Sequence, residues 1–334
     1  MTPEQLTFLI FGSLLVLALA FDLGLLSKKT SHVTIKKALW QTAFWVTLAL
    51  LFFVFVWVEN GHGRAIKYVS AYLMEWSLSI DNIFVFILIF GFFEVKEKFY
   101  GRVLLIGILM AIIFRIIFIA IGIELVTQFH WILYIFGAIL VYTGFGMFKA
   151  KNEEEETQNL QENKVYKLLK RVLPLTPEDG DGKWSIRKDG KKYYTSLFVV
   201  VIMLATTDIV FALDSIPAVF TLAKGDKLVI YTSNIFAVLG LRSLFFLLRG
   251  ASDKFAHLQQ GIAVILIFIG LKMLLEDLLV KYVLVKYHGI KEIPIYVSLL
   301  VIVTCILASI VYSITVSRNN ISKDTDAGID REIH

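Results

Sequence analysis

Nine apolar runs, each about as long as a membrane-crossing helix, constrain this chain more than any other feature of its sequence. A helix needs about 20 mostly apolar residues to cross the hydrocarbon core of a bilayer. The runs lie at residues 6–26, 38–58, 66–93, 103–123, 131–148, 196–222, 228–248, 257–280 and 293–316. The sequence therefore predicts an all-α polytopic membrane protein with about nine transmembrane helices, surrounded by a lipid bilayer.

The composition agrees with this prediction. Charged residues make up 18% of the 334 residues, compared with about 25% in a typical soluble protein. This balance excludes a disordered chain, a fibrous protein and a soluble enzyme as the main interpretations. The single cysteine, Cys305, provides neither a disulfide framework nor a cysteine metal site. The first run follows a short segment without Lys or Arg, so we expect a retained helix and not a signal peptide.

The distribution of Lys and Arg predicts the orientation, because cytoplasmic segments of membrane proteins are enriched in these residues. With the N-terminus outside, most of the 33 Lys and Arg residues fall in inside segments, and the densest group lies between Lys149 and Lys192. We therefore expect an N-out, C-in topology. The predicted organisation is helices 1 to 5 in residues 1–149, a cytoplasmic loop with a small Asp-Gly hairpin at 150–195, helices 6 to 9 in 196–316, and a disordered cytoplasmic tail at 317–334.

Two parts of the chain, residues 66–149 and 196–280, repeat the same order of features. Each has two carboxylates six residues apart, then an arginine, then a Gly-x-x-Met sequence. These are Glu75, Asp81, Arg115 and Gly144 in the first copy, and Asp208, Asp214, Arg242 and Gly270 in the second. The second copy starts three spans after the first, so it crosses the bilayer in the opposite direction. This pattern predicts an inverted three-helix repeat, which in secondary transporters places the binding site near the midplane.

The four carboxylates within the spans are the candidate metal ligands. Each charge at a helix centre is unfavourable by about 2.5–3.5 kcal/mol, so these side chains need a partner or a wet cavity. Counting from the span ends places Glu75 and Asp214 at one level, and Asp81 and Asp208 about 9 Å deeper. Two stacked acidic levels indicate a cation path. A purely structural interpretation, in which the acids pair with Arg115, Arg242 and Lys272 to lock the bundle, stays open.

Oxygen ligands dominate the surroundings of these carboxylates. Amide and hydroxyl groups that could complete a metal site are Asn82, Ser215, Asn234 and Thr207. Pro217 predicts a helix break, which would free the carbonyl of Leu213 beside Asp214. Such hard ligands suit Mn²⁺, Ca²⁺ or Mg²⁺ as a bound or transported ion, with no permanently bound cofactor. We expect the basic residues, Lys272 above all, to change partners when metal leaves or a proton enters.

The motifs resemble the TerC family of integral membrane proteins over roughly residues 10–316. The resemblance rests on the stretches Glu75–Phe84, Thr207–Pro217 and Thr232–Arg242, and on Asp22-Leu23-Gly24. It implies manganese efflux across the bacterial inner (plasma) membrane in a family grouped with LysE-type exporters and named for tellurium resistance. Glu75, Asp81, Asp208 and Asp214 match the intramembrane acids of that family, and Asp22 matches a further acidic position. Ala205 departs from the family, many members of which carry a glutamate there.

The sequence therefore predicts a transporter that exports Mn²⁺ or a similar hard divalent cation by alternating access, with protons as the exchanged ions. One alternative is a metal-binding membrane scaffold or sensor that acts in metal or tellurite stress without transport. A membrane-embedded metalloenzyme is less favoured, because no histidine lies at the centre of a span. We expect neither enzymatic activity nor nucleic-acid binding, and the sequence does not indicate a protein partner.

Overall fold

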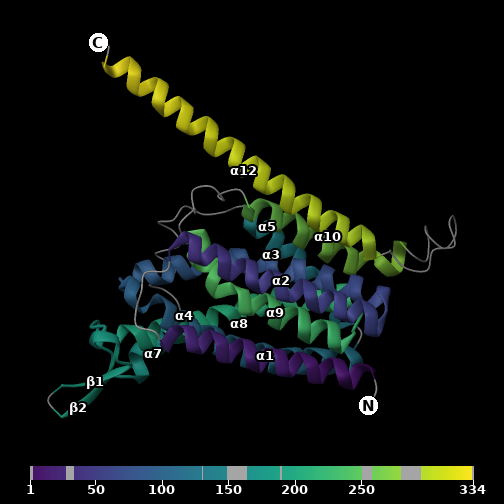
Figure 1. Ribbon diagram of the computed structural model, residues 1–334, viewed down its shortest axis with the longest axis horizontal. Helices are drawn as coiled ribbons and strands as arrows, with labels where there is room; N and C mark the ends of the chain where they lie inside the picture. The colour runs from purple at the N-terminus through teal and green to yellow at the C-terminus, as the bar shows by residue number, and fades with distance from the viewer. Residues whose placement is uncertain are drawn as a thin grey trace.

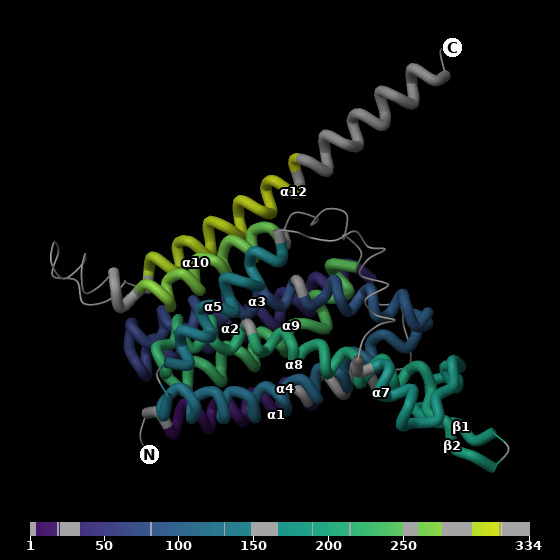
Figure 2. The backbone as a smooth tube through the Cα atoms, turned by 180° about the vertical axis from the view of Figure 1, so that it is seen from behind, coloured from purple at the N-terminus to yellow at the C-terminus, as the bar shows by residue number. Residues whose placement is uncertain are grey.

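The computed structural model describes residues 3–27, 34–129, 131–148, 164–188, 190–249, 258–279 and 295–332. Long helices lie side by side, and a small unit projects from one end of the bundle (Figures 1 and 2). Within the described residues, six helices are long and apolar enough to cross a membrane. The chain is therefore a polytopic helical membrane protein.

The bundle is formed by helices that coincide with the nine predicted apolar runs. Six of them contain a membrane-length apolar span: α2 (Ile35–Asn60), α3 (His62–Phe92), α4 (Glu97–Gln128), α8 (Ser196–Ala223), α9 (Lys227–Arg249) and α12 (Ile295–Glu332). Shorter apolar segments lie in α1 (Pro3–Ser27), α5 (Ile132–Phe148) and α10 (Leu258–Leu279). Crossing by all nine helices and the N-out, C-in orientation stay predictions.

Local signals define several helix ends. At the start of α2, the Oγ1 atom of Thr34 accepts a hydrogen bond from the backbone N–H of Lys37 at 3.4 Å, as an N-cap residue does. Gly61 separates α2 from α3 and has a φ of 89°. A residue without a Cβ adopts this angle readily, so the chain can reverse direction there in a single step.

The side chains are sorted as a membrane protein requires. Outer helices expose large apolar residues, such as Trp40, Val58 and Tyr142. The central helix α9 is buried along nearly its whole length, including its polar residues Asn234 and Arg242. Apolar surface therefore faces the region that lipid would occupy, and polar groups gather inside the bundle.

The α5–α10 seam, where these two helices pack against each other, has reciprocal glycine contacts. A Cβ atom added to Gly144 would lie 2.6 Å from Cγ1 of Ile267 and 2.9 Å from the carbonyl oxygen of Ala263. One added to Gly270 would lie 2.7 Å from the carbonyl oxygen of Gly137 and 2.8 Å from Cγ2 of Val141. The contacts are reciprocal: each glycine meets the residues three and seven positions before the other glycine, as expected around a pseudo-twofold axis. The inverted orientation of the two copies stays a prediction.

The segment between α5 and α8 contains more regular structure than the sequence indicated. The loop unit, residues 164–195, consists of α7 (Lys164–Val172), a 3₁₀ turn η1 (Gly180–Gly182) and the strands β1 (Ser185–Lys188) and β2 (Lys191–Tyr194). The strands pair antiparallel, with Lys188 opposite Lys191, so the structure has the expected hairpin. The helix α7 was not predicted, and the acidic run at residues 153–156 lies outside the described residues.

The predicted disordered tail at residues 317–334 requires a correction. The structure continues α12 as a helix through Glu332. Once a helix exists, each further residue adds a hydrogen bond without a new nucleation step. Residues 317–332 contain no proline that would stop this extension.

Candidate cation site

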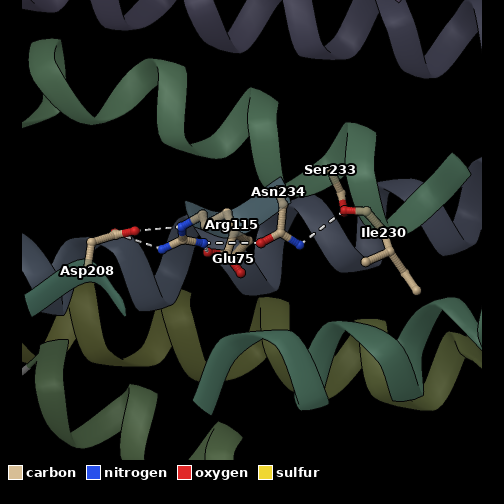
Figure 3. Close-up of polar contacts among 6 residues, drawn as sticks. All are labelled: Glu75, Arg115, Asp208, Ile230, Ser233 and Asn234. Atoms are coloured by element: carbon tan, nitrogen blue, oxygen red, sulfur yellow. Dashed lines mark hydrogen bonds and ion pairs between the residues drawn. The ribbon is translucent and has the colours of Figure 1, made fainter. Parts of the chain in front are cut away.

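The Arg115 cluster, formed by Glu75, Arg115, Asp208 and Asn234, lies inside the bundle (Figure 3). The guanidinium of Arg115 on α4 binds Asp208 on α8 with two hydrogen bonds, Nε to Oδ2 and Nη2 to Oδ1, both 2.9 Å long. Its Nη1 atom donates to Oε1 of Glu75 on α3 and, at 3.1 Å, to Oδ1 of Asn234 on α9. Four helices therefore meet at one guanidinium.

The orientation of Asn234 follows from a bond within its own helix. Its amide nitrogen donates to the carbonyl oxygen of Ile230 at 3.1 Å, one turn earlier in α9 (Figure 3). This bond leaves Oδ1 facing Arg115. Ser233 donates to the same carbonyl oxygen at 3.3 Å. The helix thus presents one oriented acceptor to a buried cation.

The charges in the Arg115 cluster do not balance. Glu75, Arg115 and Asp208 are each at most 1% exposed, and two carboxylates face one guanidinium. The second carboxylate oxygen of Glu75, Oε2, is buried and has no hydrogen-bond partner among the described residues. A buried carboxylate oxygen without a partner is unfavourable, so this atom is a candidate ligand for a cation.

The structure corrects the predicted depth of the two carboxylates. Because α3 begins at His62, Glu75 lies thirteen residues from that end, and Asp208 lies fifteen residues before the end of α8 at Ala223. The ion pair between Arg64 and Asp226, 2.6 Å long, shows that these two helix ends are neighbours. Glu75 and Asp208 therefore share one level, whereas the shorter predicted span had placed them about 9 Å apart.

Asp81 and Asp214 flank this level on opposite sides. Asp81 lies six residues further along α3, toward Phe92, and Asp214 lies six residues further along α8, toward Ala223. The two helices are antiparallel, so each backbone position is about 9 Å from the cluster, in opposite directions. The side chains of Asp81, Asp214 and Asp22 lie outside the described part of the structure, and their predicted roles stay predictions.

Comparison with known proteins identifies the family. The model of the "Integral membrane protein TerC family" matches residues 60–320. The chain belongs to the TerC family. Its relatives include the "Uncharacterized membrane protein STKORF319" of Myxococcus xanthus, which is 39% identical over 95% of this chain and 94% of the relative. The "Putative membrane-bound redox modulator Alx" of Escherichia coli (strain K12) is also 39% identical, over 86% of this chain and 88% of the relative. No solved structure matches the chain at a significant level.

The other predicted oxygen ligands of this TerC protein are buried to different extents. Asn82 and Ser215 are 2% and 1% exposed, while Thr207 is half-buried. The hydroxyl of Ser215 has no hydrogen-bond partner among the described residues, and the same holds for Ser77 and Ser79 on α3. Ser77 was missed in the sequence, although it lies only two residues after Glu75.

The three basic residues of the TerC spans occupy different environments. Arg115, and not Lys272, meets the two described carboxylates. Lys272 on α10 is 4% exposed, and its Nζ atom donates to Oγ of Ser298 on α12 at 3.1 Å. Arg242 is buried within α9. Sequence order could not identify which cation lies beside the acids, because α4 and α10 both belong to the repeats.

α8 does not end at the predicted helix break, Pro217, while the freed carbonyl of Leu213 stays a prediction. α8 is a single helix from Ser196 to Ala223 with Pro217 inside it. Proline removes one backbone hydrogen bond, but its φ of about −65° is helical, and neighbouring helices can hold the chain in place. Thr221 donates to the carbonyl oxygen of Pro217 at 3.1 Å, so its side chain adds a local contact on this turn.

The predicted metal site falls only partly on described side chains. Among the residues that the structure describes, no group of three or more His, Cys, Asp and Glu side chains is placed to hold a metal. Two of the four predicted ligands, Glu75 and Asp208, lie together, and the other two fall on undescribed side chains. The four-carboxylate set therefore stays a prediction.

Proposed function

We propose that this TerC protein is a transporter that exports Mn²⁺, or a similar hard divalent cation, across the inner (plasma) membrane of a bacterium. The observation that carries the proposal is the pair of buried carboxylates, Glu75 and Asp208. They come from the two predicted repeats, lie at one level within membrane-length helices, and face a single guanidinium. Ionisable groups at such a depth are typical of ion pathways.

The ligand chemistry favours a hard cation. Carboxylate oxygens, the amide oxygen of Asn234 and the buried hydroxyls of Ser79 and Ser215 are the donors that Mn²⁺, Mg²⁺ and Ca²⁺ accept. The buried thioether of Met74, one residue before Glu75, would suit a transition metal among these. This set supports Mn²⁺ as the first candidate cargo.

In this proposal Arg115 is an internal cation that competes with the cargo. Its guanidinium neutralises one of the two negative charges of Glu75 and Asp208, whereas a divalent cation would neutralise both. Arriving metal would therefore displace Arg115 from the carboxylates, and its departure would restore the pair. Because Arg115 also links α3, α4, α8 and α9, this exchange would change the packing between the repeats, as alternating access requires.

Asp81 and Asp214 give this path two further steps. Their positions on either side of the Arg115 cluster suit a cation that enters at one, passes the cluster and leaves at the other. A proton that takes the place of the departing metal on a carboxylate would complete the proposed exchange. We propose no enzymatic step in this sequence.

One observation favours the scaffold or sensor as a second candidate. The two-bond pair between Arg115 and Asp208 is the geometry of a strong structural ion pair. A protein that only holds metal, or only needs a rigid bundle, could use it as a lock. The redox role named for the Escherichia coli relative is less suited to this chain, because its one cysteine excludes an intrachain disulfide pair.

Flux measurements separate these candidates. Liposomes that contain the purified protein and a manganese-sensitive dye should report Mn²⁺ entry down its gradient. Asp81→Asn and Asp214→Asn should reduce entry to the rate of protein-free liposomes. The matched control is Glu124→Gln, which removes an exposed carboxylate on α4 and should transport normally. Metal binding without flux across any gradient would contradict transport and favour the scaffold.

A further inference from the structure

α7 presents apolar side chains that the bundle does not cover. Leu168 and Val172, one helical turn apart, are 59% and 66% exposed. On the adjoining part of the same helix, Tyr166 and Leu169 are half-buried and pack against the hydrophobic core. The apolar side of α7 is therefore wider than its contact with the protein, and its uncovered part consists of two large aliphatic residues.

The opposite side of α7 is basic. Lys167, Lys170 and Arg171 are exposed, and Lys164–Val172 contains no acidic residue. None of these three cations has an acidic partner among the described residues. Apolar and cationic surface therefore lie next to each other on one short helix.

The location of α7 is the level at which a membrane span ends. The ring of Tyr166 lies 6.2 Å from that of Phe92, the last residue of α3, and 5.5 Å from that of Phe93. α7 also lies beside the start of α8 (Figure 2). A helix with an apolar side and a basic side, held at the end of a span, fits the boundary between acyl chains and headgroups.

We propose that α7 lies in the membrane surface and binds anionic phospholipid. Leu168 and Val172 enter the acyl-chain region, while Lys167, Lys170 and Arg171 bind headgroup phosphates. The predicted orientation places this helix on the cytoplasmic side, where polybasic segments beside membrane spans bind anionic lipids.

A cavity next to α7 is also lined by both apolar and charged side chains. Its volume is about 720 Å³, and it opens between α7, the last residues of α3 and the first turn of α8. Its wall includes Phe92, Phe93, Tyr166 and Leu173, and its charged residues are Lys170 and Glu94. The aromatic wall suits an acyl chain, while the charges of Lys170 and Glu94 offset each other, so the phosphate contacts of the proposal are those of the exposed basic side of α7.

The acidic run of the same chain is the competing occupant. Residues Glu153–Glu156 could match the positive charge of α7. However, residues 151–163 contain one large apolar residue, Leu160, and would leave Leu168 and Val172 largely uncovered. A phospholipid satisfies both sides of the helix, which is why the geometry favours it.

Spin labels on the full-length protein test this proposal. In a Cys305→Ala background, labels at Leu168→Cys and, as the control, Lys191→Cys are compared in nanodiscs of phosphatidylcholine with or without phosphatidylglycerol. The label at position 168 should be more accessible to oxygen than to a water-soluble nickel chelate, most strongly with phosphatidylglycerol. The label at 191, on the exposed hairpin, should show the reverse.

Lipid retention then tests the cations. Removing each cation near an anionic surface should weaken binding about fivefold. Lys170→Gln with Arg171→Gln should therefore reduce the phosphatidylglycerol retained in native mass spectrometry, and Lys191→Gln with Lys192→Gln should not. Equal nickel accessibility at 168 and 191 would overturn the proposal. So would protection that is unchanged without phosphatidylglycerol, or protection lost when Glu153–Glu156 are replaced by Gln. No outcome depends on metal transport.

Discussion

The Arg115 cluster and the contact of the loop unit with the α3–α4 turn are both built from ion pairs, but they differ in solvent exposure. Arg115 and its carboxylates are almost fully buried. At the loop unit, Lys96 lies 2.7 Å from Asp179, and their side chains are 62% and 22% exposed. Removing one member of a buried pair leaves a charge that water cannot reach, whereas water replaces an exposed partner.

The loop contact also relies on interactions that survive the loss of one charge. Lys98 pairs with Asp181 at 3.0 Å. The guanidinium of Arg102 donates to the carbonyl oxygen of Gly182 at 2.9 Å and stacks over Trp184 at 4.6 Å. The central cluster therefore depends on a single guanidinium, while the loop contact is distributed over several weaker interactions.

The largest expected effect is that of Arg115→Gln. Two buried carboxylates would lose their cation, and the free energy of unfolding should fall by about 3–5 kcal/mol. Thermal unfolding in detergent measures this, with Arg187→Gln on the exposed hairpin as the control. If Mn²⁺ replaces the guanidinium, added Mn²⁺ should raise the Tm of the variant more than that of the native protein. Equal shifts would contradict the competition between Arg115 and metal.

A smaller effect is expected where the interior is packed without charge. Gly144→Ala on the α5–α10 seam would place a Cβ atom 2.6 Å from Ile267, so overpacking should lower the free energy of unfolding by about 1–3 kcal/mol. Gly146→Ala, two residues later, meets no atom within 4 Å and should leave the Tm unchanged or slightly raised. If both variants lowered the free energy of unfolding equally, close packing between α5 and α10 would not explain the effect of Gly144→Ala.

The smallest effect is expected at the exposed pair. The hydrogen bond from Lys96 holds the pKa of Asp179 below its ordinary value, and the backbone N–H of Asp181 adds to this shift. The same bond raises the pKa of Lys96. The contribution of Asp179 is therefore present above the unfolded pKa of about 3.9 and lost as the pH falls through the lower folded value. That of Lys96 is present below its unfolded pKa of about 10.4 and lost as the pH rises through the higher folded value.

Hydrogen exchange of β1 and β2 can follow this pair. Protection should be constant across neutral pH and fall slightly in acid or in high salt, which screens exposed charges. Asp179→Asn should remove most of that acid dependence, and Glu124→Gln, which removes an exposed carboxylate on α4 away from the loop unit, should leave it unchanged. If Asp179→Asn lowered the free energy of unfolding at neutral pH as much as Arg115→Gln does, the two regions would not differ in the way proposed.

Much of the architecture was predictable because lipid imposes simple rules. Each predicted apolar run falls on a helix, since backbone groups in hydrocarbon must bond within their own segment. The Asp189-Gly190 dipeptide indicated the hairpin, because this pair favours a tight turn between two strands. The helix α7 was missed because it is short and lies in a segment that was assigned as a loop from its many charged residues. The extension of α12 was missed for the same reason, since a polar composition does not stop a helix that has already started.

By itself, the sequence determined that the chain spans a membrane, which residues are charged within the spans, and that these charges occur in two ordered sets. Only the tertiary structure decided which charges meet. Arg115 binds Glu75 and Asp208 because these residues lie at one level of the packed helices α3 and α8, whereas counting from the predicted start of α3, four residues after His62, had placed them at different levels. Lys272 instead faces Ser298 on α12. The physical reason is that a partner is chosen by side-chain reach and helix register, and these depend on caps and packing between helices far apart in the sequence.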